Sequence, residues 1–141
     1  MKKQKTIKKE VSSSGIGVHT GNKTTIIFKP AEVNTGVRFV RTDLEGSPVI
    51  EADVDNVVSV ARGTTIGKGD VKVHTVEHVL AALMAFGVNN IIIEVDANEP
   101  PVGDGSAPKN GRNMSQRNIV GQVVAIGIVK GAFQGEILIQ V

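Results

Sequence analysis

Residues 73–84, Val-His-Thr-Val-Glu-His-Val-Leu-Ala-Ala-Leu-Met, constrain the fold more than any other stretch of the chain. Apolar side chains recur there with the period of an α-helix and form one stripe: Val76, Val79, Leu80, Leu83 and Met84. At about 100° per residue, His74 and His78 fall on the opposite side, with Glu77 at its edge. The spacing therefore predicts an amphipathic helix that carries two imidazoles and a carboxylate away from the core.

We expect this helix over residues 75–86, with Thr75 as its N-cap and Gly87 as its C-cap. Residues 90–96 follow as a nearly continuous apolar run, which is typical of a central strand. The sequence predicts an α+β fold, in which a small mixed or antiparallel sheet of about five strands carries the helix on one face.

Three earlier stretches have strand character. Residues 24–29 and 37–41 are separated by a Pro/Asn/Gly loop, and we expect them to pair as antiparallel neighbours. Residues 49–60 predict a strand with a break near Asp55 and Asn56. Residues 12–21, with three serines and three glycines, predict a loop in which the backbone can approach a ligand closely. On its residues alone, His19 is a surface histidine of this loop.

The amino-acid composition excludes several classes of protein and of binding site. The 141 residues form one domain by length, and with 3% aromatic residues and no Trp or Tyr the core must be aliphatic. The absence of Cys excludes disulfides and thiolate metal sites, which fits a cytoplasmic location. The N-terminal lysines lack interleaved aromatics, so we expect no nucleic-acid partner. No run approaches 18 apolar residues, so we expect no membrane span; peripheral association with a membrane is left open.

The pattern His-x-x-Glu-His has a direct chemical interpretation. Histidines four residues apart on a helix can bind one metal ion, and Glu77 can take a proton from water. This is the inverted zinc-protease pattern, with His74 and His78 as ligands. The alternative is a solvated helix face with two ordinary histidines, and the pattern alone leaves both open.

The helix motif is one of three motifs in the chain. They are Gly-Ile-Gly-Val-His-Thr-Gly at 15–21, Thr-Val-Glu-His at 75–78, and residues 90–96 followed by Pro-Val-Gly-Asp-Gly-Ser-Ala at 101–107. In this order and spacing they resemble the zinc-dependent UDP-3-O-acyl-N-acetylglucosamine deacetylase family of lipid A biosynthesis. The resemblance covers about residues 3–107.

The resemblance implies roles for individual residues. His78 matches a ligand of the family's Zn²⁺, and Glu77 matches the general base that activates water for attack on the N-acetyl carbonyl of the substrate. His19 matches a substrate-binding loop histidine close to the metal centre, and Asp104 matches a loop acid linked to catalysis. His74 matches no family ligand.

The family has two similar α+β domains, and its other two zinc ligands lie in the second. We therefore expect residues 1–107 to form the N-terminal deacetylase domain and 108–141 to form a non-matching tail, with a hairpin of residues 123–129 and 136–141, in a truncated or altered chain. Such a chain should bind zinc poorly and be inactive alone. A fused dehydratase occurs in some members. Two alternatives stay open: a non-catalytic binding or assembly module, and a metalloprotease using His74 and His78.

Overall fold

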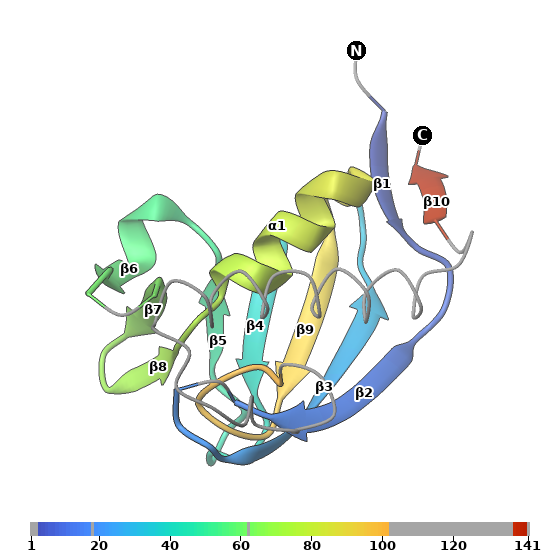
Figure 1. Ribbon diagram of the computed structural model, residues 1–141. Coiled ribbons are helices and arrows are strands. Elements are labelled where there is room, and N and C mark those ends of the chain that lie inside the picture. Colours follow the sequence, from blue (N-terminus) through green and yellow to red (C-terminus); the bar gives the residue numbers. More distant parts are fainter. Residues whose placement is uncertain (1–2, 18, 62, 102–136, 141) are drawn as a thin grey trace.

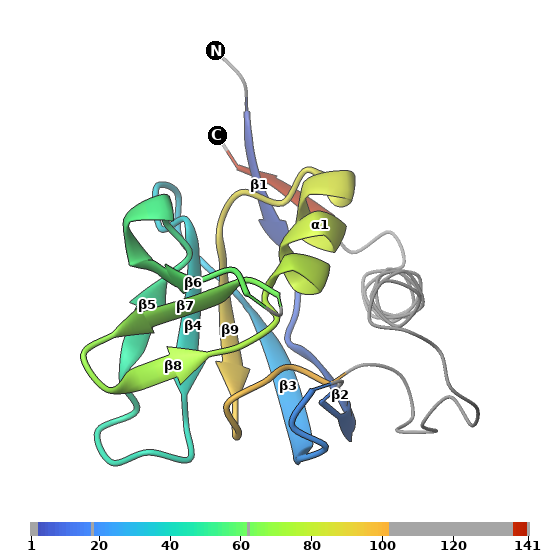
Figure 2. The same ribbon diagram turned by 60° about the vertical axis from the view of Figure 1, so that its left-hand side comes forward.

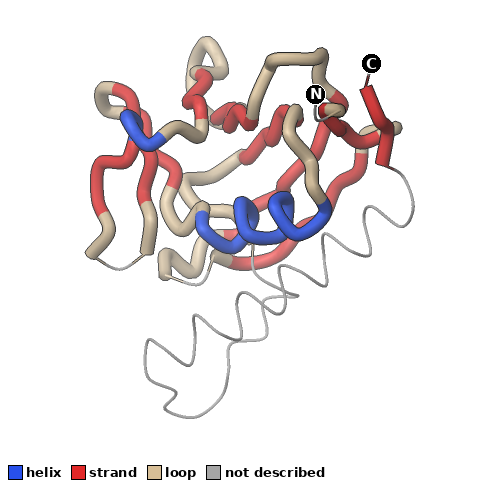
Figure 3. Tube along the Cα trace, turned by 90° about the horizontal axis from the view of Figure 1, so that it is seen from above, coloured by secondary structure: helices blue, strands red, loops and turns tan. Residues whose placement is uncertain are grey.

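The structure, a computed structural model, describes residues 3–17, 19–61, 63–101 and 137–140. Its centre is a five-stranded sheet of order β2-β3-β9-β4-β5, and helix α1 (Glu77–Phe86) lies on one face of it (Figures 1 and 3). The strands of this sheet are β2 (Val11–Ile16), β3 (Lys23–Pro30), β4 (Val37–Arg41), β5 (Val49–Glu51) and β9 (Ile91–Val95). The expected α+β fold, a mixed sheet of five strands with the helix on one face, is confirmed.

Strand β9 is the central strand, as its apolar sequence predicted, but its neighbours differ from expectation. The predicted antiparallel pairing of β3 with β4 is wrong, because β9 lies between them. Ile93 is the partner of Phe28 on antiparallel β3 and of Phe39 on parallel β4. All three side chains are buried. Strand β9 is the most apolar of the three, and a position between β3 and β4 covers both of its edges. The turn residues between β3 and β4 carry no information about a later strand that inserts between them.

The helix is two residues shorter than predicted at its start. Its N-cap is Val76, which makes no side-chain capping bond, and Thr75 has a left-handed φ of 56°. The predicted Thr75 cap is wrong because a residue outside the helix binds the backbone at this point. The N–H of Val76 donates a hydrogen bond of 3.1 Å to the carbonyl of Thr64. The predicted Gly87 cap is confirmed, with φ 69° and its N–H donating to the carbonyls of the last turn.

The buried face of the helix is also rotated from the predicted stripe. His78, Val79, Ala82 and Leu83 are its buried residues, whereas Met84 is 81% exposed. Ala82 is fully buried on this face, and its small side chain permits close packing on the sheet. As a result His78, predicted on the solvent side, is turned inward.

Strand β2 takes in part of the predicted glycine-serine loop. Residues 12–16 pair with β3 in antiparallel register, with Ser12 and Ser14 on the exposed side. The loop that precedes β3 therefore starts at Gly17. This pairing places His19 in the short turn of the β2–β3 hairpin rather than within a loop of ten residues.

Two smaller sheets flank the central one. The first has the order β6-β7-β8 and extends beside β5 (Figures 1 and 2); its strands are β6 (Val57–Ser59), β7 (Thr65–Lys68) and β8 (Val71–Val73). The 3-10 turn Val54–Asn56 is the predicted break within residues 49–60.

The second pairs β1 (Gln4–Ile7) with β10 (Ile137–Gln140) in antiparallel register. The other arm of the predicted hairpin, 123–129, lies outside the described residues. Within the described part of the chain, no helix is long and apolar enough to cross a membrane.

Candidate active site

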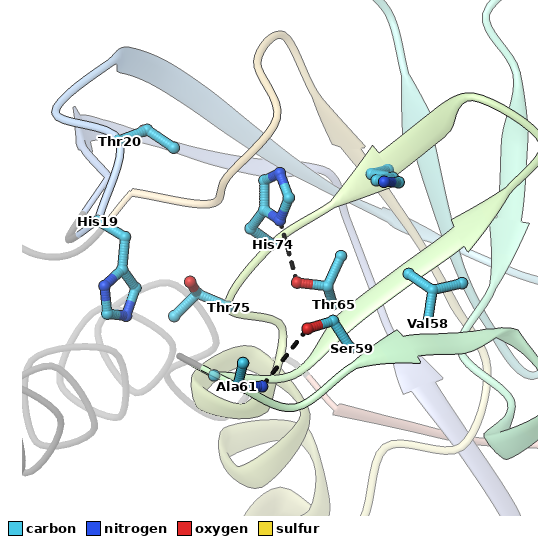
Figure 4. Close-up of a pocket in the computed structure, with 10 residues that line it drawn as sticks. His19, Thr20, Val58, Ser59, Ala61, Thr65, His74 and Thr75 are labelled. Carbon is cyan, nitrogen blue, oxygen red and sulfur yellow. Dashed lines mark hydrogen bonds between the residues drawn. The ribbon is translucent and has the colours of Figure 1, made fainter.

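Four chain segments are joined by hydrogen bonds near the N-terminus of α1: residues 19–22, 63–65, 74–78 and 97–101. A pocket of about 410 Å³ lies beside them, lined by residues of the first three segments and of strands β6 and β8. Figure 4 shows His19 and Thr20 on the β2–β3 loop, Thr65 on strand β7 and His74 just after strand β8. Its lining residues are His19, Thr20, Val58, Ser59, Ala61, Gly63, Thr65, Lys72, His74 and Thr75.

Glu77, the first residue of α1, has its carboxylate fixed by backbone. Oε2 accepts a hydrogen bond of 2.8 Å from the N–H of Thr64. Gly63 provides the space, because a Cβ there would lie 2.8 Å from Oε1 of Glu77. Oε2 of Glu77 is thus held by a backbone donor, and the residue beside Oε1 is a glycine with no side chain.

His78 is 2% exposed, and neither ring nitrogen has a hydrogen-bond partner among the described residues. Burial lowers the pKa of His78 because it removes water from the charged imidazolium. The charge of Glu77 opposes this lowering, His19 adds to it, and Glu99 opposes it. A lower pKa favours the neutral imidazole, which is the form that binds a metal ion.

His19 brings a second unsatisfied imidazole to this region. Its Nε2 is buried and has no partner among the described residues. Its backbone N–H donates to both carboxylate oxygens of Glu99, at 3.1 and 3.2 Å. The loop therefore holds His19 through its main chain and leaves the ring nitrogen available.

His74 is not part of the predicted helical pair. It precedes α1, and its Nδ1 shares a 3.0 Å hydrogen bond with Oγ1 of Thr65 (Figure 4). Residues 74–76 lie between strand β8 and helix α1, so His74 is outside the helix. The i, i+4 arrangement of His74 and His78 on one helix is therefore not formed. Asp104 lies outside the described residues.

Glu99 is the residue that the sequence did not single out. It is 1% exposed, and its carboxylate accepts hydrogen bonds from the backbone N–H groups of His19 and Thr20. The only sequence signal was an acid placed between a central strand and the pair Pro100-Pro101. A single residue in a loop belongs to no periodic pattern, so the sequence could not predict that Glu99 is buried. Only the tertiary structure shows it.

The donors present fit part of a zinc site. The unpartnered nitrogens of buried His78 suit one metal bond, and the neighbouring carboxylate of Glu77 suits a base. A hydrolytic zinc site takes three protein ligands and one open position. No cluster of three or more His, Cys, Asp or Glu that could hold a metal ion is found among the described residues.

Comparison with known proteins decides the family. The family model described as LpxC, UDP-3-O-acyl N-acetylglycosamine deacetylase, matches residues 4–131. The chain belongs to this family. The match extends beyond residue 107, where the three motifs end, into part of the segment expected to be a separate tail.

Individual relatives agree with this assignment. Over 104 residues the chain is 60% identical to the bifunctional enzyme LpxC/FabZ of Chlorobaculum tepidum, covering 74% of this chain and 22% of the relative. It is 48% identical over 105 residues to the UDP-3-O-acyl-N-acetylglucosamine deacetylase of Shewanella pealeana, covering 74% and 34%. The deacetylase of Bdellovibrio bacteriovorus is 42% identical over 127 residues, covering 90% and 39%. The chain thus spans well under half the length of these LpxC-family relatives.

Proposed function

We propose that these residues form the N-terminal part of a zinc-dependent deacetylase that hydrolyses the N-acetyl group of UDP-3-O-acyl-N-acetylglucosamine and releases acetate in lipid A biosynthesis. One observation carries the proposal: at the start of a single helix, a carboxylate fixed by backbone adjoins a buried imidazole with two unpartnered nitrogens. The family match and the names of the relatives support it.

Each residue has a distinct task in this reaction. Glu77 takes the proton from the attacking water, since its carboxylate has one oxygen held by Thr64 and is positioned as a general base. His78, kept neutral by burial, is a ligand of Zn²⁺. The ion, when bound, supplies Lewis-acid polarisation of the reacting oxygens. His19 lines the pocket and contacts substrate there, and Asp104 acts as the loop acid.

The domain division belongs to the same proposal. Residues 1–107 form the N-terminal deacetylase domain, and the remaining zinc ligands are contributed from outside the described residues. Residues 108–141 are a second segment after this domain, and the family match continues into it as far as residue 131. The enzyme acts in the cytoplasm on its nucleotide-linked substrate.

Replacement of Glu77 tests the function directly. In the complete product of the gene that encodes this chain, Glu77→Ala should lower kcat for acetate release by roughly 100-fold or more, as expected for loss of a general base. Glu51→Ala, which removes an exposed carboxylate on β5, is the control and should keep full turnover. Undiminished turnover in Glu77→Ala would leave a non-catalytic binding or assembly module as the better interpretation.

A further inference from the structure

Glu99 is a buried carboxylate to which the proposed reaction assigns no task. Its side chain is 1% exposed, so it has lost almost all of its hydration, which is costly for a charged group. The N–H of His19 donates to it at 3.1 and 3.2 Å, and the N–H of Thr20 at 2.9 Å. Charge-assisted bonds of this kind are about twice as strong as neutral ones. They replace the lost hydration only while the loop keeps its present shape.

The loop that Glu99 enters is built to receive it. The N–H of Gly17 donates to the carbonyl of Asn22 at 3.0 Å, and the N–H of Gly21 donates to the carbonyl of Gly17 at 3.1 Å. A Cβ on Gly17 would lie 2.4 Å from Oε2 of Glu99. Gly17 therefore lacks a side chain where the carboxylate packs, and the closed loop leaves its N–H groups pointing at Glu99.

The residue before Glu99 extends the connection to the start of α1. The carbonyl of Asn98 accepts a 2.7 Å hydrogen bond from the N–H of His74. The side-chain Oδ1 of Asn98 accepts a bond of 3.1 Å from Nδ2 of Asn22. Two consecutive residues after β9 thus tie the His19 loop to the segment that leads into Glu77 and His78.

We propose that Glu99 is a positioning residue for the active site: its buried carboxylate fixes the backbone of His19 and Thr20, and so sets where the His19 ring lies relative to His78. The proposal rests on the function proposed above. The unpartnered, buried Nε2 of His19 is the group whose place is set in this way. The carboxylate acts through His19 and does not itself touch substrate.

The first test is independent of activity. In the 141-residue chain, amide hydrogen exchange followed by NMR should show protected N–H groups at His19 and Thr20, and Glu99→Ala should abolish that protection. The amides of β9 serve as the fold control and should stay protected. Glu99→Gln keeps one acceptor oxygen and should retain part of the protection. Unchanged exchange at both His19 and Thr20 in either variant that retains the fold overturns the proposal.

The second test measures coupling in the complete gene product. Glu99→Ala should lower kcat roughly 10- to 100-fold, the range found when a residue that supports a site is lost. Glu99→Gln should recover part of this loss. Glu94→Gln is the matched control, because Glu94 lies five positions away and pairs with Lys29 at 3.0 Å, outside the loop. It should leave kcat unchanged.

A double-mutant cycle separates positioning from mere stability. If Glu99 acts through His19, the variant with both His19→Ala and Glu99→Ala should lose no more kcat than His19→Ala alone. Additive losses, or a lower melting temperature with unchanged kcat, contradict the inference. If Glu77→Ala retains full turnover the proposed function fails, and the exchange experiment still decides whether Glu99 holds the loop.

Discussion

The backbone N–H of Thr64 donates a 2.8 Å hydrogen bond to the carboxylate of Glu77, and the carbonyl of Thr64 accepts one of 3.1 Å from the N–H of Val76. One residue of the segment before β7 therefore holds both the first residue of α1 and the residue before it. This double contact replaces an ordinary side-chain N-cap. The same contact makes the orientation of the Glu77 carboxylate depend on the position of the β6-β7-β8 sheet. Substitutions in the segment before β7 should therefore affect activity.

Gly63→Ala should reduce activity more than it reduces stability. The added Cβ would lie 2.8 Å from Oε1 of Glu77, and the φ of 126° at Gly63 is unfavourable for alanine. A displacement of about 1 Å in a reacting group can cost roughly 100-fold in rate. We expect a loss of that order in kcat of the complete gene product, measured by acetate release.

Gly69→Ala is the control for backbone strain at position 63. Gly69 also has a positive φ, 61°, but nothing lies within 4 Å of a Cβ there. It should lower the free energy of unfolding by about 1–2 kcal/mol and leave kcat unchanged. Similar kcat values for the Gly63 and Gly69 variants would show that the contact with Glu77 has no role.

His78→Ala and His74→Ala should differ in zinc affinity. His78 has two unpartnered, buried ring nitrogens, whereas Nδ1 of His74 is bonded to Thr65. In competition titrations of the complete gene product, His78→Ala should weaken zinc binding by more than the roughly 10- to 100-fold typical of losing a supporting residue. His74→Ala should have a small effect. Equal losses in both variants would favour the metalloprotease interpretation.

Asn90→Ala should destabilise the fold without touching the site. Asn90 is 1% exposed; its Oδ1 accepts from the N–H of Gly36 at 2.9 Å, and its Nδ2 donates to Gln4 and Gln140 at 2.7 and 2.8 Å. Removal leaves buried polar groups unsatisfied, at a cost of about 1–3 kcal/mol. Urea unfolding of the 141-residue chain measures it. Asn89→Ala, which removes one exposed bond to the Lys5 N–H, should cost less; an equal cost would refute the role of burial.

Asp43 should make stability depend on pH in the acidic range. Arg41, 8% exposed, contacts it with two hydrogen bonds of 2.8 and 2.7 Å, and these bonds lower the pKa of Asp43 below its ordinary value of 3.8. A carboxyl whose pKa is lower when folded stabilises the fold above its unfolded pKa, and this contribution is lost as pH falls through the folded pKa.

The corresponding measurement compares the wild-type chain with Asp43→Asn. The difference in unfolding free energy should be largest above about pH 5 and should shrink as pH falls below the carboxyl's ordinary pKa of 3.8. The side chain of Asp43 is 30% exposed, so the difference should be small. A difference that stays constant from neutral to acidic pH would argue against the ion pair as its source.

The sequence by itself determined the elements whose signals are local. The period of residues 76–83 and the glycine at position 87 gave the helix and its end, and the apolar run at 91–95 gave the central strand. Three short motifs were enough to indicate the family that the comparisons confirm. Glu77 and His78 could be selected because the motif places them next to each other in the chain.

Only the tertiary structure decided what depends on contacts between distant segments. It placed β9 between β3 and β4, rotated α1 so that His78 is buried and Met84 exposed, and separated His74 from His78. It also brought Glu99 to the backbone of His19, across 80 residues of chain. Burial of a charged side chain follows from packing and backbone donors supplied by another loop, and no spacing within residues 97–101 encodes them.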